Sequence, residues 1–217
     1  MKNSAKFIQF AVEKGVLQFG EFTLKSGRVS PYFFNAGQFS DGDALDQLSR
    51  FYAQAIVDAD IEFDMLFGPA YKGIPLATAV AIALANEHDR NVPYAFNRKE
   101  AKQHGDGGQI VGAPIEGKVL IIDDVITAGT AINEAVSIIQ QQGGEPSAVA
   151  VAFDRQEQGS TAEYSAIDMV ENQLGLQVVT VSNLSQLIQF AEAEQLYQPH
   201  LAKLRYYYEQ YRPLNHV

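Results

Sequence analysis

Hydrophobic residues along the chain follow two periodicities in alternation, one typical of strands and one of helices. Short apolar runs rich in β-branched residues predict strands at 63–67, 92–96, 119–122, 147–153 and 177–181. Apolar residues three and four positions apart predict helices at 4–17, 43–56, 74–87, 132–142, 162–173 and 183–194, with a last helix starting at Pro199. Strands that alternate with helices predict an α/β fold with a doubly wound, mainly parallel sheet.

The amino-terminal part departs from this alternation. Between residues 20 and 35, short alternating runs are interrupted by Ser26-Gly27 and Ser30-Pro31, which predicts a small antiparallel hairpin. We expect this hairpin and the first helix to form a subdomain over residues 1–40, within a single domain that spans residues 1–217.

Three local signals refine this outline. Ser4 and Asp43 are the expected N-caps of the first two helices. The segment 98–113 is polar, rich in glycine and without periodicity, so we expect a long functional loop there.

Composition narrows the classes of protein. The chain has 217 residues, 47% of them hydrophobic, no cysteine and a net charge of −10. This acidity argues against general nucleic-acid binding and against binding to an anionic membrane surface. Without cysteine, disulfides and thiolate metal sites are excluded. No apolar run is long enough to span a membrane and the first residues do not resemble a signal peptide, so we expect a soluble, cytoplasmic protein.

The segment 119–131 contains a buried strand followed directly by residues that can bind a ligand. Asp123 and Asp124 follow the strand directly, and a turn of small and hydroxyl-bearing residues then leads into a helix. The backbone N–H groups of a helix start can hold a phosphate. Thr127 and Thr130 can add hydroxyl donors, Gly129 permits close approach, and the two carboxylates can accept hydrogen bonds from ribose hydroxyls. The segment therefore predicts a sugar-phosphate site.

Two further segments carry positive charge suited to phosphates. The turn 68–73 contains Lys72 and follows a strand, as anion-binding turns do. A basic cluster of Arg98, Lys99, Lys102 and His104 falls within seven residues, opposed only by Glu100. Within an otherwise acidic chain, this short stretch is therefore locally positive.

These motifs resemble those of a known family. The thirteen residues 119–131 resemble the phosphoribosyl pyrophosphate (PRPP) signature of the type I phosphoribosyltransferases. Residues 22–27 and 30–35 resemble the amino-terminal, base-binding hood of the orotate phosphoribosyltransferases. The turn 68–73 is similar to the family's pyrophosphate loop, and 98–105 to its flexible catalytic loop. The resemblance extends through about residue 212.

The resemblance implies roles for individual residues. The implied catalytic residues are Lys99, Lys102, His104, Asp123 and Asp124. The implied PRPP-binding residues are Lys25, Tyr71, Lys72, Arg98, Lys99, Lys102, His104, Asp123, Asp124, Val125, Ile126, Thr127, Ala128, Gly129, Thr130 and Ala131. The implied orotate-binding residues are Phe33, Phe34, Thr127 and Arg155. A cis peptide bond before Tyr71 is also implied.

The resemblance further implies a reaction and its requirements. Orotate and PRPP would give orotidine 5′-monophosphate and pyrophosphate, in pyrimidine biosynthesis. Mg²⁺ would be carried mainly by PRPP and pyrophosphate, with no dedicated protein metal site. A homodimer is implied, in which the loop 98–105 completes the neighbouring subunit's site.

Two alternatives remain open from the sequence. One is a phosphoribosyltransferase for a base other than orotate. The other is a non-catalytic regulator that senses PRPP, although the basic cluster and the lack of a DNA-binding segment argue against it. Nucleotide-hydrolase and dinucleotide-binding proteins are not favoured, because the chain contains neither Gly-x-x-x-x-Gly-Lys-Ser/Thr nor Gly-x-Gly-x-x-Gly.

Overall fold

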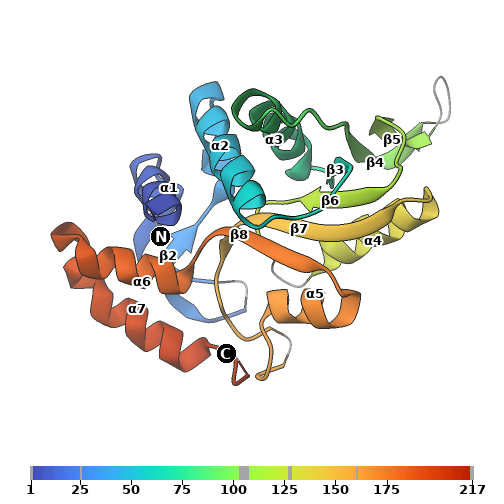
Figure 1. Ribbon diagram of the computed structural model, residues 1–217. Coiled ribbons are helices and arrows are strands. Elements are labelled where there is room, and N and C mark those ends of the chain that lie inside the picture. Colours follow the sequence, from blue (N-terminus) through green and yellow to red (C-terminus); the bar gives the residue numbers. More distant parts are fainter. Residues whose placement is uncertain (1, 25, 103–107, 127–128, 160, 216–217) are drawn as a thin grey trace.

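The computed structural model describes residues 2–24, 26–102, 108–126, 129–159 and 161–215. Its centre is a six-stranded sheet with the strand order β5-β4-β3-β6-β7-β8 (Figure 1). The strands are β3 (Met65–Gly68), β4 (Tyr94–Lys102), β5 (Gly108–Gly112), β6 (Lys118–Ile122), β7 (Glu145–Asp154) and β8 (Gln177–Asn183). Neighbouring strands are parallel except β4 and β5. The predicted mainly parallel α/β fold is confirmed.

Helices cover both faces of this sheet. They are α1 (Lys2–Glu13), α2 (Gly42–Asp58), α3 (Gly73–His88), α4 (Thr130–Gln141), α5 (Ala166–Leu174), α6 (Leu184–Ala193) and α7 (Gln198–Tyr211), with short 3₁₀ turns at Ala36–Gln38 and Gln195–Tyr197. One hydrophobic core joins alternate strand residues to α1, α2, α3, α6 and α7. A second core joins the intervening residues to α4 and α5 on the other face. Burial on both faces explains why the strands are continuous apolar runs.

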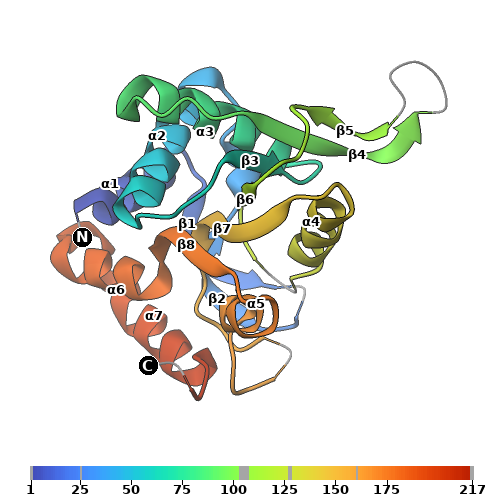
Figure 2. The same cartoon turned by 45° about the vertical axis from the view of Figure 1, so that its right-hand side comes forward.

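The amino-terminal hairpin stands outside the large sheet. It consists of β1 (Leu17–Thr23) and β2 (Val29–Phe34), which within the described part of the chain pair with each other and with no other strand. The hairpin lies beside α7 and away from the β4–β5 edge of the sheet (Figure 2). Tyr32 on β2 is fully buried, and its ring meets that of Tyr207 on α7 edge-on at 6.2 Å. Tyr32 belongs to the first of the two cores, so the hairpin is attached to the body of the protein by that shared core.

The structure corrects three local predictions. Ser4 is not an N-cap: it lies buried inside α1, and its hydroxyl is 3.1 Å from that of Ser182. Asp43 is not the cap of α2, because Asp41 accepts the N–H of Ala44 and Asp43 falls in the first turn. Both misplacements have one cause: a cap is defined by the first residue that leaves helical geometry, which apolar spacing does not locate.

The expected loop 98–113 is also only partly a loop. Residues 98–102 continue β4, and β5 pairs antiparallel to it. Alternation is weak in this hairpin because it lies at the sheet edge and carries charge. Backbone pairing, rather than an apolar face, holds it.

Candidate active site

The polar residues singled out in the sequence gather at the carboxyl ends of three neighbouring strands. β3 leads into the turn 69–72, β6 into Asp123 and Asp124, and β7 into Arg155. Because β3, β6 and β7 are adjacent and parallel, these ends lie along one edge of the sheet. This is the position at which open α/β sheets bind ligands.

The turn after β3 is packed too tightly for side chains at its two glycines. A Cβ at Gly68 would overlap the carbonyl oxygen of Gly73, and a Cβ at Gly73 would come within 2.8 Å of the carbonyl oxygen of Ile122. Asn97 on β4 accepts the N–H of Ala70 at 2.8 Å. The turn is thereby held against both neighbouring strands, with its backbone available to a ligand.

The peptide bond between Ala70 and Tyr71 is cis, which confirms the geometry implied by the resemblance. Tyr71 itself is 69% exposed. It therefore belongs to the surface of the site.

Asp123 and Asp124 are both buried, and Lys72 bridges them to the turn. Asp123 is 8% exposed and Asp124 7%. The Lys72 ammonium lies 2.5 Å from Asp124 Oδ2, and the N–H of Asp124 donates to Asp123 Oδ1 at 2.9 Å. A cation and two carboxylates from separate strand ends thus form one cluster, as expected for a site that binds both phosphate and ribose.

Burial changes the ionisation of this pair. It raises the pKa of Asp123 to about 7; the negative charge of Asp124 raises it further and the N–H of Asp124 partly offsets the rise. Tyr52 on α2 donates its hydroxyl to the carbonyl of Asp123 at 2.7 Å. Burial also raises the pKa of Tyr52 well above its ordinary value, so Tyr52 remains a neutral donor that fixes the backbone beneath the acids.

The start of α4 follows the acidic pair closely. Gly129 is its N-cap, with φ +72°, and offers no side chain to cap the first turn. Thr130 and Ala131 in that turn are exposed, so their backbone N–H groups are open to an anion. Thr127 and Ala128 lie outside the described residues. The half-buried residues that connect the acids to this helix are Val125 and Ile126.

The basic segment lies on β4 beside the turn. The Lys99 ammonium is 5.3 Å from the centre of the Tyr71 ring, which links this segment to the turn 69–72. Arg98 precedes it on the same strand, and Lys102 is the last residue of β4. His104 lies outside the described residues.

Phe33 and Phe34 on β2 have different surroundings. Phe33 is 38% exposed and stacks on Phe22 at 5.5 Å between ring centres. Phe34 is half-buried and stacks on Phe153 of β7 at 5.1 Å. Successive residues of a strand point to opposite sides, so Phe33 is the ring more available to a planar base. Lys25 lies outside the described residues.

Arg155 stands beside the hairpin with its guanidinium already engaged. Its Nε donates to Glu157 Oε1 at 2.8 Å, and its Nη2 donates to the Ser30 hydroxyl at 3.2 Å. Its place after β7 agrees with the sequence. Its partner Glu157 and the supporting residues Tyr52 and Asn97 were not predicted, because each acts on a residue that only the fold brings close.

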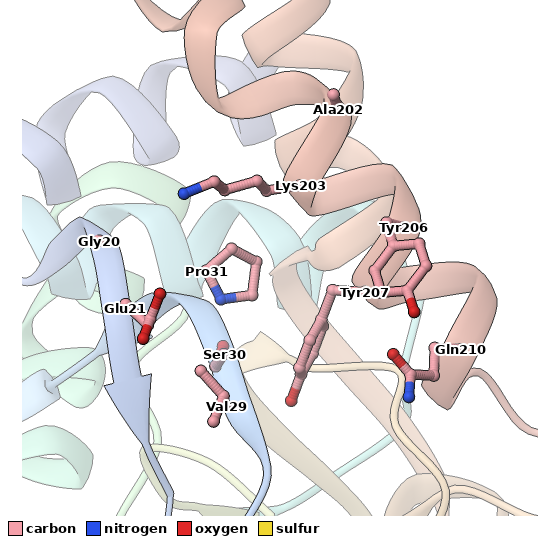
Figure 3. A pocket seen from close by; sticks show the side chains of 10 residues that line it. All are labelled: Gly20, Glu21, Val29, Ser30, Pro31, Ala202, Lys203, Tyr206, Tyr207 and Gln210. Atoms are coloured by element: carbon pink, nitrogen blue, oxygen red, sulfur yellow. The ribbon is translucent and has the colours of Figure 1, made fainter.

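A cavity of about 340 Å³ lies between the hairpin and α7 (Figure 3). Its lining includes Ser30 and Tyr207, which both contact Arg155, but neither Phe33 nor Arg155 itself. The cavity is therefore adjacent to the candidate site but is not part of it.

Neither a metal cluster nor a membrane span is evident in the described residues. They contain no group of three or more His, Cys, Asp or Glu side chains arranged to hold a metal ion. Within the same ranges, no helix is both long enough and apolar enough to cross a bilayer.

Comparison with known proteins identifies the family. Residues 35–183 match the phosphoribosyl transferase domain. The orotate phosphoribosyltransferase of Klebsiella pneumoniae is 58% identical over 206 residues, covering 95% of this chain and 96% of the relative. That of Pseudomonas fluorescens is 59% identical over 206 residues, covering 94% and 96%.

A solved structure agrees with these relatives. The crystal structure of orotate phosphoribosyltransferase from Francisella tularensis superposes with a TM-score of 0.87 at 41% identity, covering 95% of this chain and 99% of that one. The chain belongs to the orotate phosphoribosyltransferase family.

Proposed function

We propose that this protein transfers the phosphoribosyl group of PRPP to orotate, giving orotidine 5′-monophosphate and pyrophosphate in the pathway to UMP. The observation that carries the proposal is the cluster of Asp123, Asp124 and Lys72 at adjacent strand ends, in a chain that belongs to this family. The cluster combines hydrogen-bond acceptors for ribose with a cation for the diphosphate.

PRPP binds across the ends of β3 and β6. The 5′-phosphate is held by the N–H groups at the start of α4 and by Thr127 and Thr130, beside Val125, Ile126 and Ala128. Asp123 and Asp124 accept the ribose hydroxyls. The diphosphate lies on the turn with Tyr71 and Lys72 and is reached by Lys25, Arg98 and Lys99. The glycine packing of the turn supports this arrangement, since it brings backbone rather than side chains to the ligand.

Orotate binds under the amino-terminal hairpin. The pyrimidine lies against Phe33, with Phe34 and Thr127 completing its surroundings, and Arg155 meets its carboxylate. A planar anion is suited to an aromatic face together with a guanidinium that donates charge-assisted hydrogen bonds to its carboxylate.

The transfer breaks the bond between the ribose C1 and the diphosphate oxygen and forms a bond between C1 and N1 of orotate. The N1 proton is released in the same reaction, and the departing pyrophosphate is a base that can take it. As pyrophosphate departs, the ribose becomes oxocarbenium-like and the leaving group gains negative charge. Asp123 and Asp124 stabilise the positive sugar, while Lys99, Lys102 and His104 stabilise the pyrophosphate. No covalent enzyme intermediate is required.

We further propose that the reaction depends on Mg²⁺. The residues fit an ion delivered by the substrate: the carboxylate of Asp124 is paired with Lys72, and a hard, octahedral cation retains waters and phosphate oxygens as ligands. When bound, Mg²⁺ neutralises diphosphate charge. The chain's own contribution is to orient the ribose and to exclude water around it.

We also propose a cytoplasmic homodimer in which the 98–105 loop serves the neighbouring site. A complementation experiment tests the dimer. Mixed subunits carrying Lys102→Ala and Asp124→Asn should recover about a quarter of wild-type activity, since half the dimers then contain one intact site. Activity that stays at the level of the separate variants contradicts the shared site.

The direct test of function is an orotate absorbance assay with PRPP, with and without Mg²⁺. We expect orotate to be consumed only when both are present. Turnover of hypoxanthine or uracil, with none of orotate, would overturn the choice of base. Absence of any base transfer would favour the PRPP-sensing alternative.

The role of the basic loop is tested by Lys102→Ala. Its contact forms as the leaving group departs, so kcat should fall far more than PRPP binding weakens. Equal turnover in the variant and the wild type contradicts this role.

A further inference from the structure

A network of charged and aromatic side chains lies behind Arg155 and has no part in the proposed reaction. Its centre is Glu157, which accepts hydrogen bonds from Arg155 Nε at 2.8 Å and from the Tyr207 hydroxyl at 2.8 Å. Arg28 adds a contact from its Nη1 to Glu157 Oε2 at 3.3 Å. The side chain of Arg155 is 18% exposed and that of Glu157 12%. The hairpin, the segment after β7 and α7 therefore meet at one carboxylate.

This network fixes the orientation of the Arg155 guanidinium in two ways. Its edge is held because Nε and Nη2 both contact Glu157 Oε1, while Nη2 also donates to Ser30 Oγ. Its face is held because the ring of Tyr32 lies 4.6 Å from Cζ. A guanidinium is planar and its five N–H donors are rigidly placed. Fixing one edge and one face therefore fixes where Nη1 lies.

The donors of Nη1 are left for a ligand. No hydrogen bond joins Nη1 to any residue in the described ranges, whereas the other two nitrogens are engaged. Arg155 keeps its charge: burial alone would lower its pKa, but Tyr32 and Glu157 raise it above the ordinary value. An anion reaching this edge meets a fixed cation with two unused N–H groups.

Glu157 is held in place by other residues, so it supports Arg155 and does not compete with a ligand for the free N–H groups of its guanidinium. Tyr207 extends from α7 toward Ser30 of the hairpin (Figure 3). Its hydroxyl donates a hydrogen bond to Glu157. Burial and the charge of Glu157 raise the pKa of Tyr207 to about 12, so Tyr207 remains a donor at neutral pH. Withdrawing Glu157 from Arg155 would break contacts with Tyr207 and Arg28 as well.

We propose that Glu157, anchored by Tyr207 and Arg28, is a positioning residue that presents the Nη1 side of Arg155 to the carboxylate of orotate. This inference builds on the proposed function and adds the specificity of the same site. It makes recognition of the carboxylate depend on a residue that does not touch the substrate, and on α7, which lies far from Arg155 in the sequence.

The test compares Glu157→Gln with the wild type using two ligands that differ in the carboxylate. The KM for orotate should rise about tenfold, equivalent to about 1.4 kcal/mol, while the KM for PRPP stays within about twofold. Uracil, which lacks the carboxylate, is measured as a competitive inhibitor against orotate, and its inhibition constant should also stay within about twofold. A misplaced guanidinium lowers the affinity only for orotate, whose carboxylate it would have bound, and leaves the affinity for uracil unchanged.

Two further variants accompany this measurement. Tyr207→Phe removes one hydroxyl from the network and should raise the KM for orotate about threefold, again without affecting uracil. This variant also carries the test if Glu157→Gln does not fold. Glu192→Gln is the matched control, because it removes a carboxylate from an exposed ion pair with Arg205 on α6 and α7. Its kinetic constants should equal those of the wild type.

The outcomes separate this inference from the function on which it builds. If wild-type protein does not use orotate, the proposed function fails. If wild-type protein uses orotate but the variants leave its KM unchanged, only the positioning role fails. Equal weakening of orotate and uracil also overturns that role, since it would mean that Glu157 merely supports the fold of the site.

Discussion

The two sides of the candidate site, one proposed to bind PRPP and the other proposed to bind orotate, are built by different means. On the PRPP side, the turn after β3 and the start of α4 present backbone groups, and Gly68 and Gly73 keep side chains away. On the orotate side, recognition relies on side chains drawn together from distant segments, such as Arg28 and Glu157, which are 129 residues apart. A phosphate can be held by short local segments, whereas a particular base requires groups that the whole fold assembles.

This difference suggests how the two sides respond to change. The PRPP side depends on close backbone packing and on two buried acids, so alterations there affect the fold as well as binding. The hairpin is held by aromatic contacts with β7 and α7. Substitutions in the hairpin should therefore lower the stability of the protein less than substitutions on the PRPP side. Three predictions test this contrast.

The largest effect is expected at Asp123. Because its pKa rises from 3.8 to about 7 on folding, the folded protein binds this proton more tightly than the unfolded chain. The stabilising contribution is therefore complete below about pH 4 and is lost as pH rises through about 7. Relative to wild type, Asp123→Asn should gain up to about 4 kcal/mol in free energy of unfolding between pH 4 and pH 8.

Urea unfolding across that pH range measures this difference. Asp58→Asn, at an exposed carboxylate at the end of α2, is the control and should run parallel to the wild type. A pH-independent difference between Asp123→Asn and the wild type would show that Asp123 is not destabilised by its burial.

A smaller but still severe effect is expected at Gly68. The added methyl group of Gly68→Ala would overlap the carbonyl of Gly73, so the turn must shift at a cost of about 3 kcal/mol. Gly42→Ala is a matched control, because a Cβ at Gly42 meets no atom within 4 Å. Thermal unfolding should show a lower Tm for the first variant only; equal Tm values would mean that the turn yields easily.

The smallest of the three concerns Phe33 and Phe34. Phe34→Ala removes contacts with Phe153 and Phe7 and should cost about 2 kcal/mol of stability, less than a fully buried ring. Phe33→Ala removes an exposed ring and should cost less than about 1 kcal/mol. Denaturant titration distinguishes them, and the reverse order would mean that Phe34, not Phe33, is the ring free to meet a base.

The same contrast explains what could be predicted from sequence. The turn 68–73 and the segment 119–131 each contain their chemistry within one stretch, so the strand ends and the residues beside them were placed correctly. Tyr52 and Glu157 were missed, because one is an ordinary apolar position on a helix face and the other acts through Tyr207, fifty residues away. The β4–β5 hairpin was mistaken for a loop because backbone pairing leaves no apolar pattern.

The central claim is that, apart from Thr127, which is proposed to serve both, phosphate binding and base selection reside in separate groups of residues. Steady-state kinetics of Lys72→Gln and Phe33→Ala, with the second substrate saturating in each case, tests it most directly. We expect Lys72→Gln to raise the KM for PRPP about tenfold or more with little change for orotate, and Phe33→Ala to do the reverse. Parallel changes in both constants in both variants would contradict the claim.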